Sequence, residues 1–476
     1  MNVTRTRFAP SPTGALHAGT VRTALFAWLV AKHNNGQFIL RIEDTDQARA
    51  MEGAVKNIED SLHYIGIDWD EGPGKEGQTG PYLQSERLDI YKEWAKRLID
   101  SGRAYADPYS KEELDDLRDE AKAKSIAFLY RNHRPENPRA WDGTQPLRFK
   151  SDPSAYRWDD AVLGELSAPD SSVDDFILMK SDGFPTYNFA HIVDDHLMEI
   201  THVIRSSEFL SSIPRYLNLY DALNIPVPIM ATVPNVLNET GNKKLSKREG
   251  AKQILEYRDI GILPAAMVNF LVMLGWNDGT TQEIFSLAEL IKKFDLSRVQ
   301  KSGAKFDENR LFWLNGHYIR GTNLDELFKI TKKYWPKESE NYPDDYKKKV
   351  LGLIQERLKY FTEIPDLSTF FFKDLPINKE LIKTNPKLSS LSNEEVVSLL
   401  KTSRESLEQS SFELEDLNNR LNGLLETTSQ KPAVLFSLIR IATTNAPASP
   451  GLAETLAVLG KEVSIRRIDE TLKSMS

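Results

Sequence analysis

Residues 7–46 read RFAPSPTGALHAGTVRTALFAWLVAKHNNGQFILRIEDTD. They predict a strand over 3–8, a loop rich in proline and glycine, an amphipathic helix and a second strand over 38–42. Along the helix, apolar residues recur at three- and four-residue spacing, at Val21, Ala24, Leu25, Trp28 and Leu29. This order is the opening unit of an open α/β sheet, in which ligands bind at the carboxyl ends of the strands. The stretch has neither a GxGxxG fingerprint nor Walker spacing, so it predicts neither a dinucleotide fold nor a P-loop.

Bulk properties indicate a globular chain of two to four domains, with 476 residues, 40% hydrophobic and 27% charged. It contains no cysteine, which excludes disulfides and cysteine-ligated zinc. No apolar run approaches the ~20 residues that span a bilayer, and no signal core follows the N-terminus, so we expect a cytoplasmic protein without a membrane partner. The net charge of −8 argues against a polyanionic partner, but salt screening over about 8–10 Å makes local lysine clusters the better guide.

Motifs in the first 250 residues resemble those of the glutamyl-tRNA synthetase family, a branch of the class I aminoacyl-tRNA synthetases. HAGT at 17–20 is similar to the class signature HIGH, and KLSKR at 244–248 is similar to the second signature, KMSKS. RFAPSPTG at 7–14 and RIEDTD at 41–46 resemble signatures of the glutamyl and glutaminyl branch. The stretches FPTYNFAHIVDDH at 184–196 and THVIRSSEFLSSIPRY at 201–216 resemble its second catalytic half.

The resemblance implies an α/β fold: a Rossmann-like parallel-sheet catalytic domain with an α+β insertion, followed by an all-α anticodon-binding region. We expect the two halves of the catalytic domain at 1–80 and 187–240 and an insertion that grips the acceptor end of tRNA at 81–186. A connecting domain with the KLSKR loop would follow at 241–324, and the helical anticodon-binding region at 325–476. Glutaminyl enzymes carry β-barrels in that last region, where this chain shows only helical spacing.

Local patterns add four expectations about single elements. A helix should cover 47–65 with Asp46 as its N-cap, and residues 176–179 should form a buried strand of the parallel sheet. His63 and His202 should lie in the core or be half-buried. His133, flanked by arginines, could contact phosphate, but a role in capping a turn is favoured.

Adenylate formation requires cations, because negative charge builds on the β- and γ-phosphates as pyrophosphate leaves. Ammonium groups on a loop can stabilise that charge in the transition state. By resemblance, the catalytic residues are His17, Lys244 and Lys247. The ATP-binding residues would be Thr13, His17, Gly19, Glu208, Lys244, Leu245, Ser246 and Lys247, and Mg²⁺ would accompany ATP.

An amino acid with two carboxylates and one ammonium group requires guanidinium groups and an acid. By resemblance, the glutamate-binding residues are Arg7, Ala9, Ser11, Glu43, Tyr187 and Arg205. Arg7 and Arg205 are the cations, and Glu43 would accept the ammonium group. Which arginine holds the side-chain carboxylate stays open, as does the effect of His191 and Phe209 on substrate preference.

His191, Asp194, Asp195 and His196 have a spacing that could bind zinc. The alternative is that the two aspartates cap the next segment or pair with arginines, and the family carries no metal here. We therefore expect no zinc.

The expected partners are tRNA(Glu) and L-glutamate, with tRNA bound before glutamate is activated, and a monomer is expected. Arg357 falls near a family position that reads the anticodon, although an ordinary surface residue is an equal alternative. A glutaminyl-tRNA synthetase and a catalytically silent tRNA-binding or regulatory protein are the rival hypotheses, with a non-tRNA adenylyltransferase less favoured. Whether tRNA(Gln) is also charged stays open.

Overall fold

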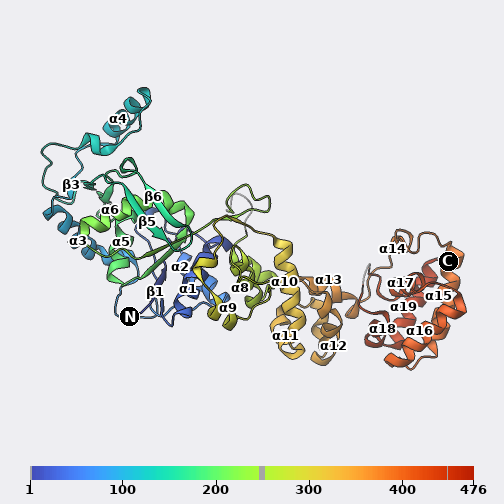
Figure 1. Ribbon diagram of the computed structural model, residues 1–476. Helices are drawn as coiled ribbons and strands as arrows, with labels where there is room; N and C mark the ends of the chain where they lie inside the picture. The colour runs from blue at the N-terminus through green and yellow to red at the C-terminus, as the bar shows by residue number, and fades with distance from the viewer. Residues whose placement is uncertain (1–2, 246–251, 447–448, 476) are drawn as a thin grey trace. The chain divides into compact units, whose positions relative to one another are not determined.

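A computed structural model describes residues 3–245, 252–446 and 449–475 (Figure 1). The chain divides into two compact units, the first comprising 1–259 and 264–311 and the second comprising 260–263 and 312–476. Ser246 and Lys247, named above as site residues, lie outside the described residues. No helix in the described part of the chain is long and apolar enough to cross a membrane.

The first unit is built on the predicted opening unit. β1 (Arg5–Phe8) and β2 (Gln37–Leu40) pair in parallel, in register from Arg5 opposite Gln37 to Phe8 opposite Leu40. α1 (Ala18–His33) connects them, and its apolar face is fully buried, as the spacing predicts. Gly36 is required before β2, because a Cβ there would lie 2.0 Å from the carbonyl oxygen of Thr4.

A second sheet, in the order β6-β5-β9-β8, continues the first. β8 (His202–Ser206) runs parallel to β9 (Ile229–Val233), β5 (Tyr156–Asp160) joins β9 in parallel, and β6 (Gly164–Ala168) pairs antiparallel with β5. Thr201 connects the sheets, since its amide donates to the carbonyl of Arg5 at 2.9 Å and its hydroxyl accepts from the amide of Arg5 at 2.8 Å. The carboxyl ends of β1 and β8 therefore lie at one edge.

Helices cover this framework (Figure 1). α1 packs against α8 (Pro264–Met273) and α9 (Leu287–Lys293), and α5 (Tyr187–Leu197) packs against α3 (Leu88–Asp100) and α6 (Ile213–Leu223). The remaining elements of this unit include α2 (Ala54–Tyr64), α4 (Lys111–Ala123), α7 (Ile254–Ile260) and a parallel pair formed by β10 (Val236–Leu237) and β11 (Ala304–Lys305).

Part of residues 81–186 forms its own antiparallel sheet of β3 (Ala104–Ala106), β4 (Leu147–Phe149) and β7 (Ile177–Met179). The expectation that 176–179 joins the parallel sheet is therefore wrong. The run is buried, as predicted, but its partner is β4. An apolar run shows that a strand is buried but does not show the direction of its neighbour.

Two other local expectations are also wrong. α2 begins at Ala54 after Gly53, whose φ of 73° interrupts the helix expected over 47–65, and the side chain of Asp46 makes no capping bond. His63 is exposed, with its ring stacked on Trp69. His202 is half-buried as expected. The ring of His133 stacks on Phe128 at the end of a short 3-10 helix, and the choice between capping and phosphate contact stays a prediction.

The second unit contains only helices among residues 312–446 and 449–475, which confirms the all-α tail. α10 (Glu308–Gly321) begins in the first unit, and its residues from Phe312 onward belong to the second unit. The helices that follow are α11 (Leu324–Thr331), α12 (Asp344–Ile354), α13 (Ile364–Ser368), α14 (Glu380–Lys383), α15 (Asn393–Glu408), α16 (Leu414–Thr428), α17 (Pro432–Thr444), α18 (Leu452–Leu459) and α19 (Lys461–Met475). Leucine and isoleucine side chains from α15 to α19 form one apolar core.

Candidate active site

A cavity of about 740 Å³ lies at the edge where β1 and β8 end. It brings together every predicted amino-acid and ATP residue within the described part of the chain. They are Arg7, Ala9, Ser11, Thr13, His17, Gly19, Glu43, Tyr187, Arg205, Glu208, Lys244 and Leu245. Arg357 does not belong to this group, because it is an exposed residue of the second unit that follows α12.

The first signature forms the start of α1. His17 is the N-cap residue, and its Nδ1 accepts from the amide of Thr20 at 3.4 Å while its Nε2 lies 3.2 Å from the Thr20 hydroxyl. A Cβ at Gly19 would lie 3.2 Å from the imidazole, so glycine leaves room for the ring to fold back over the first turn. Thr20, at the position of the second histidine of the class signature, therefore has a defined role in orienting His17.

The segment around the second signature lies beside the first. Leu245 is the last described residue before 246–251, and its amide donates to the Val236 carbonyl at 2.8 Å. After residue 251, Gln253 pairs with His17 in an antiparallel bridge, and the amide of Ile254 donates to the Leu16 carbonyl at 2.9 Å. Gln253 and Ile254, which follow the second signature, therefore lie next to the HAGT turn.

Lys244 and Glu208 form an ion pair along the wall of the cavity. Lys244 Nζ lies 2.5 Å from Glu208 Oε2, and the hydroxyl of Ser206 donates to Glu208 Oε1 at 2.9 Å. Burial alone would raise the pKa of Glu208, but these two hydrogen bonds lower it below its ordinary value. Both side chains are nearly half exposed, so a triphosphate can compete for the lysine.

Arg22, which was not among the predicted residues, connects the two signature segments. Its Nη1 donates to the Leu274 carbonyl at 2.7 Å, and its Nη2 donates to the carbonyl of Pro234, which precedes the KLSKR segment. The side chain lines the cavity but is 2% exposed, and burial lowers its pKa to about 10. Arg22 therefore fixes α1 to the stem that leads into the second signature.

The floor of the cavity is a buried network of charges. Arg7 forms a fork with Asp195, with Nε 3.0 Å from Oδ1 and Nη2 3.2 Å from Oδ2. Arg41 donates to Asp195 Oδ1 at 2.8 Å and to Glu43 Oε1 at 2.9 Å. Asp194, the neighbour of Asp195 on α5, instead accepts from Arg87 and from two neutral side chains, Gln84 and Tyr91, each at 2.8 Å.

These pairings confirm the ion-pair alternative for Asp194 and Asp195 and leave the zinc hypothesis without support. His191 is 1% exposed and lies between the rings of Tyr187 and Tyr216. Burial and then the charge of Arg205 lower its pKa well below its ordinary value, so it is neutral at pH 7. No cluster of three or more metal-ligating side chains occurs among the residues that the structure describes.

Besides Arg22, whose Nε also has no hydrogen-bond partner among the described residues, two groups that line the cavity are not electrostatically satisfied. Burial raises the pKa of Glu43 above its ordinary value, although Arg41 acts in the opposite direction. Arg205 is 6% exposed, and its Nε and Nη1 are shielded from solvent without a hydrogen-bond partner among the described residues. The guanidinium lies over the rings of Phe209 and Tyr216, at 5.5 and 5.4 Å from their centroids. A buried guanidinium without an acceptor is costly, so the cavity is built to receive an anion.

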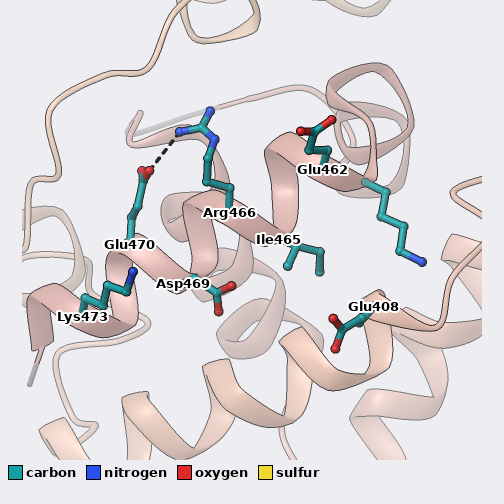
Figure 2. Close-up of a pocket in the computed structure, with 8 residues that line it drawn as sticks. Glu408, Glu462, Ile465, Arg466, Asp469, Glu470 and Lys473 are labelled. Atoms are coloured by element: carbon teal, nitrogen blue, oxygen red, sulfur yellow. Dashed lines mark hydrogen bonds and ion pairs between the residues drawn. The ribbon is translucent and has the colours of Figure 1, made fainter.

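A second cavity of similar volume lies in the second unit, along α19 (Figure 2). Figure 2 shows Arg466 paired with Glu470 on α19 and Glu408 of α15 opposite. Arg466 and Glu470 are each more than 40% exposed. This surface groove has no buried charge without a partner among its described residues, and we assign it no site.

Comparisons with known proteins agree with this geometry. Residues 3–313 match the family described as tRNA synthetases class I (E and Q), catalytic domain, and residues 326–472 match an anticodon binding domain. The chain therefore has the fold of a class I aminoacyl-tRNA synthetase, and all the residues that line the cavity lie within the matched catalytic domain.

Similarity over the full length defines the branch. A glutamate–tRNA ligase of Clostridium novyi is 42% identical, over 98% of this chain and 96% of the relative, and one from Caldanaerobacter subterraneus is 39% identical over 99% and 98%. The crystal structure of a glutamate tRNA ligase from Elizabethkingia meningosepticum in complex with its amino acid superposes with a TM-score of 0.89 at 32% identity, covering both chains completely. The chain belongs to the glutamate–tRNA ligase family.

Proposed function

We propose that this enzyme attaches L-glutamate to tRNA(Glu) through a glutamyl-adenylate intermediate, with ATP as the energy source. The observation that carries the proposal is Arg205, a buried cation that lines the cavity and has two nitrogens without an acceptor among the described residues. A ligand carboxylate would supply that acceptor and form a charge-assisted pair in a poorly solvated site.

The balance of buried charges supports an acidic amino acid. Around the amino-acid pocket, Arg7, Arg41 and Arg87 are matched in number by Glu43, Asp194 and Asp195, so Arg205 remains as an excess cation. Arg22 also lines the cavity, but its guanidinium donates to main-chain carbonyls and is left out of this set. Glutamate, with two carboxylates and one ammonium group, carries the single negative charge that neutralises this set. Glutamine carries no net charge and would leave one buried guanidinium uncompensated, a penalty that discriminates strongly against it.

Within the amino-acid pocket, Arg7 and Arg205 would bind the two carboxylates, and Glu43 would accept the ammonium group. The raised pKa of Glu43 favours this role, since an ammonium group would stabilise the charged form of this carboxylate. Ser11 and Tyr187 would add hydroxyl contacts and Ala9 a backbone contact.

ATP would occupy the other end of the cavity, with its phosphates near the N-terminus of α1 and the residues Thr13, His17 and Gly19. There the α-carboxylate of glutamate would attack the α-phosphate. Lys244, Leu245, Ser246 and Lys247 would bind the departing pyrophosphate, and Lys244 would exchange its pairing with Glu208 for the phosphates. Mg²⁺ would arrive with ATP and neutralise part of the phosphate charge.

The tRNA would span both units. The insertion over 81–186 would hold the acceptor end, and 325–476, with Arg357, would read the anticodon. Lysine clusters elsewhere would contact phosphates and position the molecule. We further propose that tRNA binds before glutamate is activated and that the enzyme acts as a monomer in the cytoplasm.

Charging assays test the proposal directly. Purified enzyme with ATP and Mg²⁺ is expected to charge tRNA(Glu) with glutamate and to leave it uncharged with glutamine. The same assay with tRNA(Gln) determines whether that tRNA is also a substrate. Exchange of pyrophosphate into ATP is expected only when tRNA is present. Glutamine charging without glutamate charging would overturn the assignment in favour of a glutaminyl enzyme.

The role of the second signature has a separate test. Lys247→Ala is expected to lower kcat by a factor on the order of 10² to 10³, with little change in the KM for glutamate, because the ammonium group acts on charge that develops in the transition state. Unchanged turnover with weaker glutamate binding would refute that role.

A further inference from the structure

Arg7 and Glu43, the two charged residues on the floor of the amino-acid pocket, depend on a single carboxylate. Asp195 contacts Arg7 through both of its oxygens and contacts Arg41 through Oδ1. Arg41 in turn holds Glu43 at 2.9 Å. Asp195 is 1% exposed, and Arg41 is completely buried, so no solvent competes for these contacts.

We propose that Asp195 is a positioning residue that aligns both ends of the amino-acid pocket, Arg7 directly and Glu43 through Arg41. This inference rests on the proposed function, because it assigns roles within that same pocket. Asp195 does not line the cavity and would not touch glutamate.

The fork between Asp195 and Arg7 fixes the plane of the Arg7 guanidinium. A bidentate pair restrains both rotation and translation of the planar group, which a single hydrogen bond does not. The other contact of Arg7 in this region is Nη1 to the Ile204 carbonyl at 3.4 Å, which is too long to restrain the group equally. The orientation in which Arg7 meets a ligand carboxylate is therefore set from α5, across the end of β1.

Arg41 extends the same restraint to Glu43. Its three potential carboxylate partners lie at different distances: Asp195 at 2.8 Å, Glu43 at 2.9 Å and Asp194 at 3.6 Å. Asp195 and Glu43 are thus the close partners, one on each terminal nitrogen of Arg41. Loss of Asp195 would release the guanidinium that holds Glu43 in place.

Asp194 provides a matched control, because it is the adjacent residue on α5, has the same side chain and is equally buried. Its bonds go to Arg87, Gln84 and Tyr91, none of which lines the cavity. Asp194 therefore holds α5 to α3 and to the turn that precedes α3, whereas Asp195 holds α5 to the pocket.

The experiment compares Asp195→Asn with Asp194→Asn in the full-length enzyme. Each replacement keeps the shape of the side chain and removes the charge. Asp195→Asn is expected to raise the KM for glutamate about 30-fold and to leave the KM for ATP unchanged within about two-fold. Asp194→Asn is expected to lower the thermal midpoint and to leave the KM for glutamate within about two-fold of wild type.

Two outcomes would overturn the proposal. One is an unchanged KM for glutamate in Asp195→Asn. The other is a rise in the KM values for glutamate and ATP together, with a loss of thermal midpoint equal to that of Asp194→Asn, as expected of a residue that only stabilises the fold.

If Asp195→Asn does not fold, Asp195→Glu carries the test, because it retains the charge while it moves the fork by one methylene. It is expected to raise the KM for glutamate about five-fold without changing the KM for ATP, and an unchanged KM for glutamate would overturn the proposal. Failure of the wild-type enzyme to charge tRNA(Glu) with glutamate would instead refute the proposed function, so the two failures are distinguishable.

Discussion

The interior beneath the cavity and the interior of the C-terminal helices are built in opposite ways. Beneath the cavity, α5 presents Asp194 and Asp195 to arginines from three other segments, all of them buried. Between α15, α17 and α19, the corresponding positions are filled by residues such as Leu400, Leu438 and Ile468, which are completely buried. Apolar packing is non-directional and tolerates substitution by residues of similar volume, whereas buried charges require matched partners. The charged interior therefore restricts which ligand can bind in the cavity, whereas the apolar interior only stabilises the packing of the helices.

The sharpest way to break this comparison is to remove Arg205, a buried cation with two nitrogens that have no hydrogen-bond partner among the described residues. Arg205→Met is expected to lower kcat/KM for glutamate by about 10³-fold or more, because a ligand carboxylate loses a desolvated bidentate partner. The free energy of unfolding, measured by urea titration, is expected to stay constant or rise by about 1 kcal/mol, since an uncompensated charge is removed from the interior.

Arg41→Met is the matched control, because it removes a buried cation whose two terminal nitrogens both donate to carboxylates. It is expected to lower the free energy of unfolding by about 3–5 kcal/mol, as two carboxylates lose their partner. An equal loss of stability in both variants would show that Arg205 is satisfied in the free enzyme.

A substitution in the apolar interior should lower stability without affecting glutamate binding, the reverse of Arg205→Met. Leu438→Ala, on α17, is expected to lower the free energy of unfolding by about 3 kcal/mol through a cavity at a fully buried position. The KM for glutamate should not change. Leu414→Ala, at a position that is 44% exposed, is the control and should cost less than about 0.5 kcal/mol. A higher KM for glutamate in Leu438→Ala would contradict the separation of the two interiors.

A third variant tests the charged interior by pH. Glu71 accepts from Arg5 at 3.0 Å, from Tyr82 at 2.6 Å and from Thr79 at 2.7 Å, and although burial acts in the opposite direction, these bonds lower its pKa to about 2. Its stabilising contribution is therefore complete above about pH 4.5 and is lost as the pH falls towards 2. Glu71→Gln should cost about 1–3 kcal/mol of unfolding free energy at pH 7, with a cost that shrinks across that window. A cost that is independent of pH would contradict a charged role for Glu71.

The smallest effect is expected where a charge pair is exposed. Glu208→Gln removes the partner of Lys244, but both side chains are more than 40% exposed, so the free energy of unfolding should change by less than about 0.5 kcal/mol. The KM for ATP should rise by a few-fold, since Glu208 is a proposed ATP contact. Glu239→Gln removes an exposed carboxylate five residues before Lys244 and is the control. A change in stability as large as that of Glu71→Gln would show that the pair is effectively buried.

Much of the fold could be predicted because it depends on spacing. The buried face of α1, the strands on either side of it and the helical tail all follow from apolar periodicity, and the structure confirms them. The expectations that were wrong depended on facts that a local pattern does not contain. The partner of β7 is β4, an antiparallel strand about thirty residues earlier in the chain, and the local sequence of β7 does not identify it. The left-handed conformation of Gly53 interrupts a pattern that is otherwise helical.

The described residues of the predicted amino-acid and ATP site line one cavity, but the residues that hold them in place were missed. For Asp194 and Asp195 the sequence left open capping of the next segment and pairing with arginines, and it could not indicate that one serves the pocket and the other serves α3. Adjacent residues on a helix point about 100° apart, so their partners are decided by tertiary packing. Arg41, at the start of the RIEDTD motif, was the available signal, because an arginine next to an apolar strand is buried and is costly unless a partner neutralises it.

The contacts of Arg22 should constrain the residues on their two sides unequally during evolution. Both acceptors are main-chain carbonyls, those of Pro234 and Leu274, and any amino acid at those positions supplies the same atom. Substitutions there need no compensating change at Arg22, so statistical coupling between the three positions should be weak even though they touch. In a saturation mutagenesis screen, Arg22 would tolerate few substitutions, whereas Pro234 and Leu274 would tolerate many. Co-variation analysis alone would therefore miss the contact through which Arg22 connects the two signature segments.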